Sequence, residues 1–140
     1  TNKINMELGV AISEEAYTAF SKVNKKHGKW VIFKSDSNNE TVLVDSEGGL
    51  DSNFDEFRDA LPDHEPRWAV FDLKIEKPDG STAQKIVFYS YIPDSYTGTN
   101  KLFFSASKET IMKNFEGIAR SIQANDKDDV NEKEAIELFL

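Results

Sequence analysis

Residues 67–91 read RWAVFDLKIEKPDGSTAQKIVFYSY, and this stretch decides the fold. Its two apolar runs, 68–75 and 85–91, are rich in aromatic and β-branched residues, which are typical of strands. Between them stands Pro78-Asp79-Gly80, a turn in which proline fixes φ and glycine accepts a positive φ. Asp72 interrupts the first run, and we assign it to a polar side of that strand. The stretch therefore predicts a β-hairpin at the centre of the fold.

Further strands and helices mix on both sides of this hairpin. Ser13 and the two glutamates after it are a typical helix start, because the hydroxyl caps free N–H groups and the acids suit the positive end of the helix. Gly28 is the expected end of that helix. We expect strands at 30–34 and 41–44 (a second hairpin), 102–104 and 121–124, and helices at 53–61, 107–118 and 131–140. Such a mixture predicts a central mixed sheet covered by helices.

The whole chain has the composition of one globular domain. It has 140 residues, of which 39% are hydrophobic, enough to bury a core. Without cysteine it can form neither a disulfide nor a thiolate metal site, which fits a reducing compartment. No apolar run approaches the roughly 20 residues of a membrane span, and no secretory signal pattern is visible. We therefore expect a soluble intracellular protein. The formal net charge of -8 argues against nucleic-acid binding, so we expect no nucleic-acid partner.

No pattern of catalytic residues stands out in the sequence. The two histidines, His27 and His64, lie in polar connections without a neighbouring nucleophile, so we interpret them as solvated loop residues. The sequence contains no nucleophile elbow, no phosphate-binding loop and no dinucleotide-binding glycine motif. We therefore expect a binding protein without a cofactor, not an enzyme.

One short segment partly matches a calcium-binding loop. Asp126, Asp128 and Glu137 fall at positions 1, 3 and 12 of that template. Val130 and Asn131 stand where the template needs an oxygen ligand and a glycine. Because these two residues remove a ligand and the required turn, we attribute the match to chance and expect no metal site.

Several segments together resemble a known family. They are 9–13 (GVAIS), 67–72 (RWAVFD), 85–88 (KIVF), 101–109 (KLFFSASKE) and 122–126 (IQAND). In this order and spacing they are similar to the ADF/cofilin (actin-depolymerising factor homology) family, over nearly the whole chain. The resemblance implies an α/β (α+β) ADF-homology fold, with a central mixed sheet of five to six strands and helices on both faces. Because the first residues are polar and the chain has the length of one domain, we also expect a flexible N-terminal segment at 1–8 and a single ADF-homology domain at 9–140.

The same resemblance implies a monomeric cytoplasmic, cytoskeleton-associated protein that binds actin monomers and filaments and promotes filament depolymerisation and turnover. Its monomer-binding residues would be Leu8, Gly9, Val10, Lys101, Leu102, Lys108, Met112, Lys113 and Glu116. Its filament-side residues would be Lys85 and Glu137. A helix with an exposed apolar ridge and a few cations suits the hydrophobic cleft that this family occupies on actin.

Several cations that are typical of the family are replaced in this chain. Thr99 and Met112 stand at two basic positions of the monomer-binding surface. Ala83, Gln84 and Leu138 stand at positions of the filament-side surface where basic residues are usual. Because such charges contribute to affinity and association rate, we expect retained but weakened monomer binding, and weaker filament binding and severing.

Regulation would differ as well. Leu8 stands at the position of the serine whose phosphorylation switches many family members off. Leucine has no hydroxyl to phosphorylate, so that switch would be missing at its usual place. Phosphoinositides, through Lys101, Lys108 and Lys113, are candidate partners.

Other interpretations stay open at this point. A glia maturation factor-like protein, which would bind Arp2/3 complex and debranch actin networks, is favoured by the segment 61–67 and the Leu138-Phe139-Leu140 ending. Coactosin is a more distant alternative within the same fold. A carrier of lipids or small molecules would need a large apolar pocket, which the sequence does not reveal.

Overall fold

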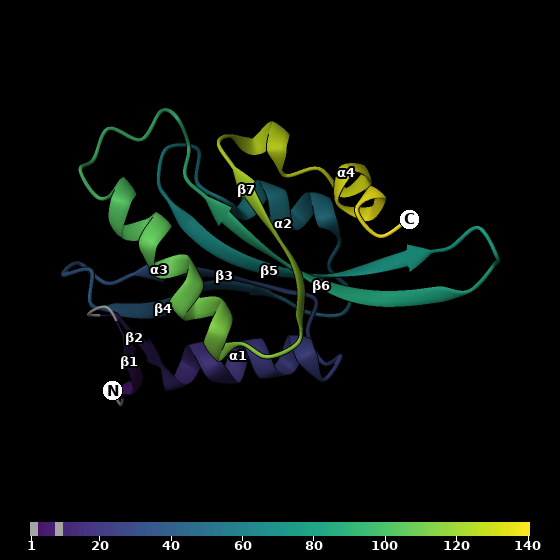
Figure 1. Cartoon of the computed structure of the whole chain (residues 1–140), viewed down its shortest axis with the longest axis horizontal. Coiled ribbons are helices and arrows are strands. Elements are labelled where there is room, and N and C mark those ends of the chain that lie inside the picture. The colour runs from purple at the N-terminus through teal and green to yellow at the C-terminus, as the bar shows by residue number, and fades with distance from the viewer. Residues whose placement is uncertain (1–2, 8–9) are drawn as a thin grey trace.

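The computed structural model describes residues 3–7 and 10–140, with side chains from residue 10 onward. Within these residues a seven-stranded mixed sheet has the order β1-β2-β4-β3-β5-β6-β7 (Figure 1). Its strands are β1 Lys3–Glu7, β2 Val10–Ser13, β3 Trp30–Ser35, β4 Thr41–Gly48, β5 Arg67–Glu76, β6 Thr82–Tyr91 and β7 Ile118–Ala124. The helices are α1 Glu14–Asn24, α2 Phe54–Ala60, α3 Lys101–Asn114 and α4 Glu132–Glu137, with the short 3-10 helix η1 Lys127–Asp129 before α4.

The sheet contains two parallel strand pairs, and one of them determines where α3 lies. β2 pairs with β4 and β6 pairs with β7 in parallel, whereas the other neighbours are antiparallel. A parallel pair needs a crossover connection, and α3 supplies the one between β6 and β7. α3 therefore lies across one face of the sheet, the face that α1 also covers (Figure 1).

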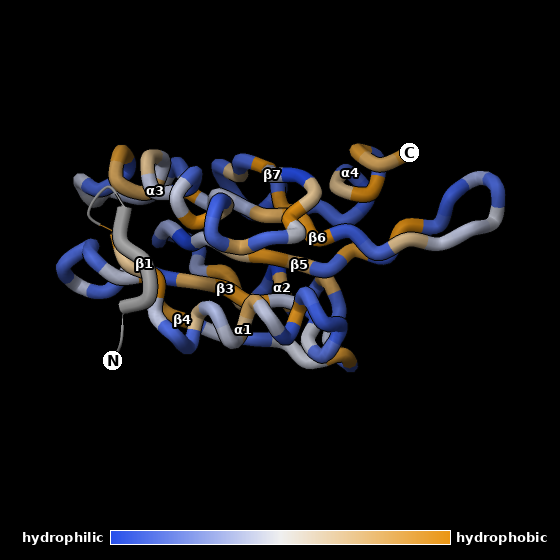
Figure 2. The backbone as a smooth tube through the Cα atoms, turned by 60° about the horizontal axis from the view of Figure 1, so that its bottom comes forward, coloured by the Kyte–Doolittle hydropathy of each residue, from blue (hydrophilic) through white to orange (hydrophobic). Residues whose placement is uncertain are grey.

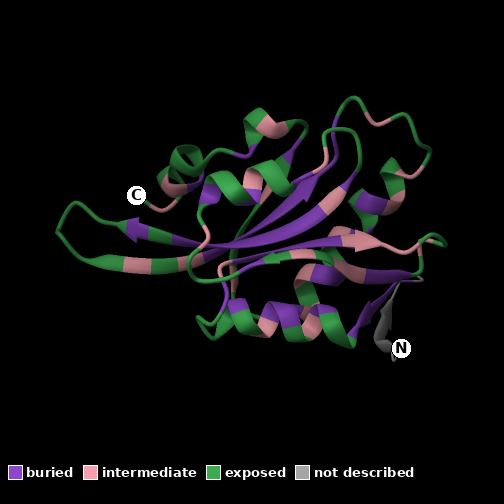
Figure 3. Cartoon of the chain, turned by 180° about the vertical axis from the view of Figure 1, so that it is seen from behind, coloured by how far each residue is buried: buried purple, intermediate pink, exposed green. Residues whose placement is uncertain are grey.

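Hydrophobic side chains fill both faces of the sheet. One core lies under α1 and α3 and includes Phe20 and Phe115, while the other lies under α2 and α4 and includes Phe54 and Ala135. Figure 3 shows the central strands buried between these two layers. Because both faces are covered, β3 and β5 are hydrophobic over most of their length, in contrast to the turn between β5 and β6 (Figure 2).

The hairpin expected at 67–91 is confirmed. β5 and β6 have ten residues each and pair antiparallel over their full length. In the turn between them Gly80 has a φ of 88°, the left-handed conformation that glycine accepts easily. Beyond Ile75 on β5, and before Ile86 on β6, side chains emerge from the core. The end of the hairpin therefore projects past the helices (Figures 1 and 3).

Asp72 does not lie on a polar side of β5, as we expected, but is only 2% exposed. Lys26 Nζ lies 3.2 Å from its carboxylate, and Gln84 Nε2 donates a hydrogen bond to it at 2.9 Å. A buried carboxylate is tolerated only when it is paired and hydrogen-bonded. Lys26, from the loop after α1, therefore lets a charged residue close this end of the core.

The first helix is confirmed with a shifted end. Ser13 caps α1 by accepting a hydrogen bond from the Ala16 N–H at 3.1 Å. The helix ends at Asn24, however, and Lys26 rather than Gly28 has the positive φ, of 66°. The N–H groups of His27 and Gly28 then both donate hydrogen bonds to the Lys22 carbonyl, a helix end that needs a left-handed residue at this position.

Two further strands stand at the first edge of the sheet. The segment 9–13 resembled only the approach to α1, yet 10–13 form β2, and β1 pairs with it antiparallel. The sheet therefore counts seven strands when β1 is included. The α/β (α+β) class, with a mixed sheet and helices on both faces, is confirmed.

Candidate functional site

The strand expected at 102–104 is wrong, because these residues form the first turn of α3. Phe104 packs on Trp68 with ring centroids 4.6 Å apart, and Trp68 Nε1 donates a hydrogen bond to the Phe104 carbonyl at 3.3 Å. Ile111 and Phe115 follow at helical spacing and enter the same core. A short apolar run fits a strand or a helix equally well, and here the packing on Trp68 favours the helix.

The outer side of α3 carries a row of exposed residues. Leu102, Glu109 and Lys113 recur at seven- and four-residue spacing, so they lie on the same side of the helix, and Lys101 stands at the edge of that side. Leu102 stands beside Lys101 and is 80% exposed. A single exposed leucine is common on protein surfaces and means little alone. Here it lies on a helix face that also carries two cations, which is the composition of a surface that docks into an apolar groove.

The start of α3 is poorly stabilised by its own residues. Asn100 makes no side-chain capping bond, and the first turn contains no acid. Lys101 instead stands at the positive end of the helix dipole, an arrangement that costs about 0.3–1 kcal/mol. Helix stability therefore does not explain why a lysine stands at this position.

The other predicted residues of α3 are less accessible. Lys108 is half-buried, and its Nζ lies 3.9 Å from the carboxylate of Glu109. Met112 packs partly against the core under α1 and α3, so a partner would reach only part of its side chain. Glu116 is exposed in the turn after α3, where Gly117, with a φ of 102°, leads the chain into β7.

The N-terminal part of the predicted monomer site is described only at Val10. This residue begins β2 and is 1% exposed, so its side chain belongs to the core and does not form surface. Leu8 and Gly9 lie outside the described residues.

The predicted filament-side residues lie on the opposite face of the sheet from α3. Lys85 shares the orientation of Val87, whose side chain lies in the core under α2 and α4. Glu137 is exposed at the end of α4 and therefore belongs to the same face. Ala83 also faces this side and packs against its core, whereas Gln84 faces α1.

Sequence reasoning missed one residue on this face. Arg120, on β7, is exposed, and its Nη2 donates a hydrogen bond to the carbonyl of Leu138 at 3.2 Å. The contact joins β7 to the end of α4. No sequence pattern marked Arg120, because its orientation depends on the register of β7 against β6.

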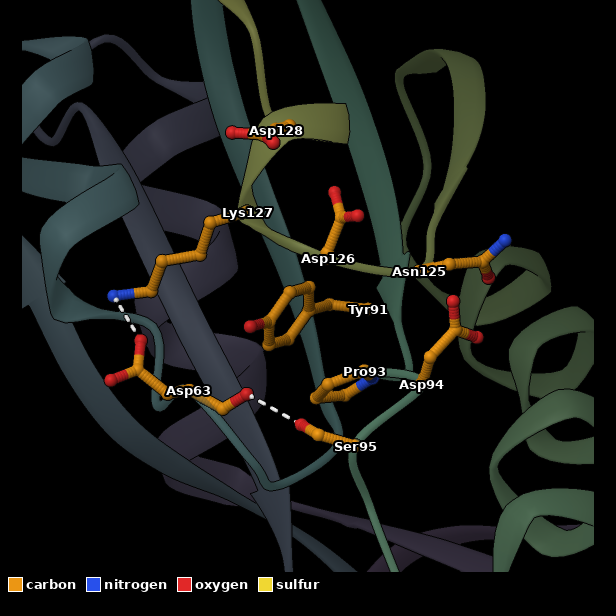
Figure 4. A pocket seen from close by; sticks show the side chains of 9 residues that line it. All are labelled: Asp63, Tyr91, Pro93, Asp94, Ser95, Asn125, Asp126, Lys127 and Asp128. Atoms are coloured by element: carbon orange, nitrogen blue, oxygen red, sulfur yellow. Dashed lines mark hydrogen bonds and ion pairs between the residues drawn. The ribbon is translucent and has the colours of Figure 1, made fainter.

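A hollow of about 380 Å³ lies where β6 ends and η1 begins (Figure 4). Asp126 and Asp128, from the calcium-loop template, line it. Its one lysine, Lys127, is paired with Asp63 at 3.1 Å. Burial raises the pKa of Tyr91, whose hydroxyl donates a hydrogen bond to a backbone carbonyl at 2.8 Å. The lysine of the hollow is therefore already paired, and a tyrosine with a raised pKa is not a base near neutral pH.

Other kinds of site find no support in the described part of the chain. Residues 3–7 and 10–140 contain no group of three or more His, Asp or Glu that could hold a metal ion. His64 Nδ1 lies 2.7 Å from the Ser95 hydroxyl on an exposed loop, and His27 is exposed. Among the same residues no helix combines the length and apolar character needed to cross a bilayer.

Comparison with known proteins agrees with this geometry. Residues 9–138 match the model of a family described as cofilin/tropomyosin-type actin-binding protein. The chain is 30% identical over 125 residues to actophorin of Acanthamoeba castellanii, covering 89% of this chain and 90% of the relative. It is 32% identical over 124 residues to an actin-depolymerizing factor of Vitis vinifera, covering 88% and 87%. The crystal structure of Streptomyces griseoflavus cofilin matches with a TM-score of 0.83 and 28% identity, covering 92% of this chain and 96% of that one.

Proposed function

This chain belongs to the cofilin/tropomyosin-type family of actin-binding proteins, and from this premise we propose that it binds actin monomers and filaments and promotes filament depolymerisation and turnover. The observation that carries the proposal is the outer side of α3, where Leu102 protrudes beside Lys101. The protein acts by binding and not by catalysis. It works in the cytoplasm, on the actin cytoskeleton.

In the monomer contact, α3 docks into an apolar groove of actin. Leu102 is the apolar anchor, because it is already exposed and buries its side chain only on binding. Lys101 and Lys113 contact acidic groups at the rim of the groove. Met112 adapts its exposed part to the groove, as methionine does on many binding surfaces.

The remaining residues of the monomer site follow from the family resemblance. Lys108 and Glu116 flank the docked side of α3. Leu8 and Gly9 approach the same groove, while Val10 contributes through its backbone, since its side chain is buried. We expect ADP-actin to be the preferred monomer.

The second contact is made with the side of the filament, by Lys85 and Glu137. It is weaker than in relatives whose hairpin carries more basic residues, because Ala83, which faces this side, offers no charge. Severing is correspondingly weak.

Neither the structure nor the relatives described above add support to the glia maturation factor alternative. The relatives described above are an actophorin, an actin-depolymerizing factor and a cofilin. Arp2/3 complex and phosphoinositides are therefore secondary partners of the proposal. Polymerisation assays with and without Arp2/3 complex, and competition between lipid vesicles and actin, test them directly.

The monomer contact is tested by replacing Lys101 and Lys113 together with alanine. We expect the affinity for fluorescently labelled ADP-actin monomers to fall by about 1–3 kcal/mol, because two cations leave the rim of the contact. A matched control replaces two exposed lysines elsewhere, Lys77 in the hairpin turn and Lys133 on α4.

The control pair removes the same charge and should change the monomer affinity little. If the Lys101/Lys113 variant bound actin as tightly as the unmodified protein, the contact would lie elsewhere on the chain. If the unmodified protein did not bind actin at all, the proposed function itself would be wrong.

A further inference from the structure

A β-bulge changes the orientation of β7 near its start. Along β6, Ile86 pairs with Ile118 of β7, but the next residue, Val87, pairs with Arg120, so Ala119 is an extra residue on β7. An extra residue reverses the alternation of side chains beyond it. Bulges of this kind re-aim side chains and are frequent next to functional sites.

The two cores of the protein show the effect of this bulge. Ile118 packs against the core under α1 and α3, whereas Ile122 and Ala124 pack in the core under α2 and α4. Without the bulge, all even-numbered residues of β7 would face the same side. Arg120 follows the bulge and shares the orientation of Ile122, which agrees with its hydrogen bond to Leu138 after α4.

The register then brings Arg120 close to Lys85. Arg120 lies beside Val87, and Lys85 precedes Val87 by two residues on the same face of β6. With strands about 4.8 Å apart and a rise of about 3.3 Å per residue, the two Cα atoms are roughly 8 Å apart. The two cations thus form one patch, with Glu137 and the 41% exposed Leu138 at its border.

We propose that Arg120 is a filament-binding residue, which the bulge at Ala119 turns toward the α4 face to form a cationic patch with Lys85. This inference deepens the proposed function and rests on it. The partner that binds this patch is the acidic side of an actin filament. Two adjacent cations and a partly exposed leucine favour an acidic protein surface of this kind. Arg120 also binds the backbone at the end of α4 through its hydrogen bond to Leu138, so it supports the same surface to which it adds a positive charge.

Arg120 thereby offsets a deficit on this side of the molecule. Leu138 is uncharged at a position where the resemblance led us to expect a cation, and the guanidinium of Arg120 lies against the carbonyl of that same residue. A positive charge stands at the end of α4 after all, but it comes from β7. Monomer binding through α3 does not depend on it.

Filament co-sedimentation of charge variants tests the inference. We compare Arg120→Glu, Arg120→Gln and Arg120→Lys with Lys74→Glu, which makes an equal charge reversal on β5, on the opposite face of the sheet. Arg120→Gln should weaken filament binding roughly two- to fivefold, as expected for one exposed ion pair, and Arg120→Glu should weaken it further. Arg120→Lys and Lys74→Glu should stay within about twofold of the unmodified protein.

Two further measurements separate the outcomes. Affinity for actin monomers should be unchanged in every variant, which also shows that the variants are folded. The loss of filament binding with rising salt should be shallower for Arg120→Gln than for the unmodified protein, because one charge contact is missing. A salt dependence equal to that of the unmodified protein would mean that Arg120 only supports α4, and would overturn the inference.

The inference and the proposed function fail in different ways. If the unmodified protein binds filaments but Arg120→Glu is no weaker than Lys74→Glu, the inference is wrong and the function stands. If the unmodified protein binds neither monomers nor filaments, the proposed function is wrong and the inference falls with it.

Discussion

Tyr89 and Tyr91 lie two residues apart on β6 and point into the same core, yet their hydroxyls have different surroundings. The Tyr91 hydroxyl donates a hydrogen bond to the Pro62 carbonyl at 2.8 Å. The Tyr89 hydroxyl is buried and has no hydrogen-bond partner among the described residues. A buried polar group without a partner costs free energy, whereas a satisfied one contributes modestly to stability.

Replacing each tyrosine with phenylalanine should therefore have opposite effects. Tyr89→Phe should leave the free energy of unfolding unchanged or raise it by up to about 1 kcal/mol, because an unsatisfied hydroxyl is removed. Tyr91→Phe should lower it by about 0.5–1.5 kcal/mol, because a hydrogen bond is lost and the Pro62 carbonyl gains no new partner. Urea denaturation of the two variants measures both changes.

The alkaline stability of the same variants provides a second measurement. Burial raises the pKa of Tyr89, so the folded protein keeps its proton at a pH where the unfolded chain loses it. The resulting contribution to stability is fully present below the ordinary tyrosine pKa of about 10 and is lost as the pH rises above it. Tyr89→Phe should lose less stability above pH ~10 than the unmodified protein. An equally steep loss in the variant and the unmodified protein would show that the pKa of Tyr89 is the same in the folded and unfolded states.

Single residues also show where sequence reasoning reached its limit. The cap at Ser13 was predictable because it depends on neighbours in the chain. Asp72 was not, since its partner Lys26 lies 46 residues away and comes close only after α1 packs on the sheet. Accordingly, a carboxylate that looked solvated from its polar character is buried.

At the scale of elements, the projecting hairpin presents two different faces. Ala83 and Lys85 face the α4 side, whereas Gln84 faces α1 and donates its hydrogen bond to Asp72. Both Ala83 and Gln84 replace cations of the family, but only the first position points toward the filament-side patch. A charge restored at the two positions should therefore act differently.

Ala83→Arg should raise filament affinity roughly two- to fivefold, because a cation joins Lys85 and Arg120 on one face and one exposed ion pair contributes about 0.2–1 kcal/mol. Gln84→Arg adds the same charge on the other face, where Asp72 would bind it, so filament affinity should change by less than about twofold. Co-sedimentation over a range of actin concentrations measures both. Equal gains from the two variants would contradict the orientation argued here.

Elements were predictable from the sequence where their pattern was long and local. The hairpin at 67–91 is confirmed because two long apolar runs flank a turn with a clear conformational preference. The first turn of α3 was assigned wrongly, since three apolar residues carry no periodicity. The bulge at Ala119 has no local signal at all, because it is defined only by the pairing of β7 with β6.

At the scale of the whole molecule, the two proposed actin contacts lie on opposite faces of one sheet. α3 packs on the face that α1 covers, while Lys85 and Arg120 face α4. The chain carries a net charge of -8, so each contact is a local group of cations on an acidic body. The family resemblance anticipated both groups of residues in part, but their separation by the sheet became visible only in the fold.

This separation predicts that the two contacts contribute independently to filament binding. Lys113→Ala should weaken both monomer and filament binding, whereas Lys85→Ala should weaken filament binding alone. In the double variant the losses of filament binding free energy should add to within about 0.5 kcal/mol, because the sheet keeps the two side chains apart and they share no partner. A double-mutant cycle measured by co-sedimentation, with monomer affinity measured in parallel, tests this. A coupling well above that limit would mean that one contact forms only after the other has changed the protein. The two surfaces would then not bind independently on opposite faces of a rigid sheet.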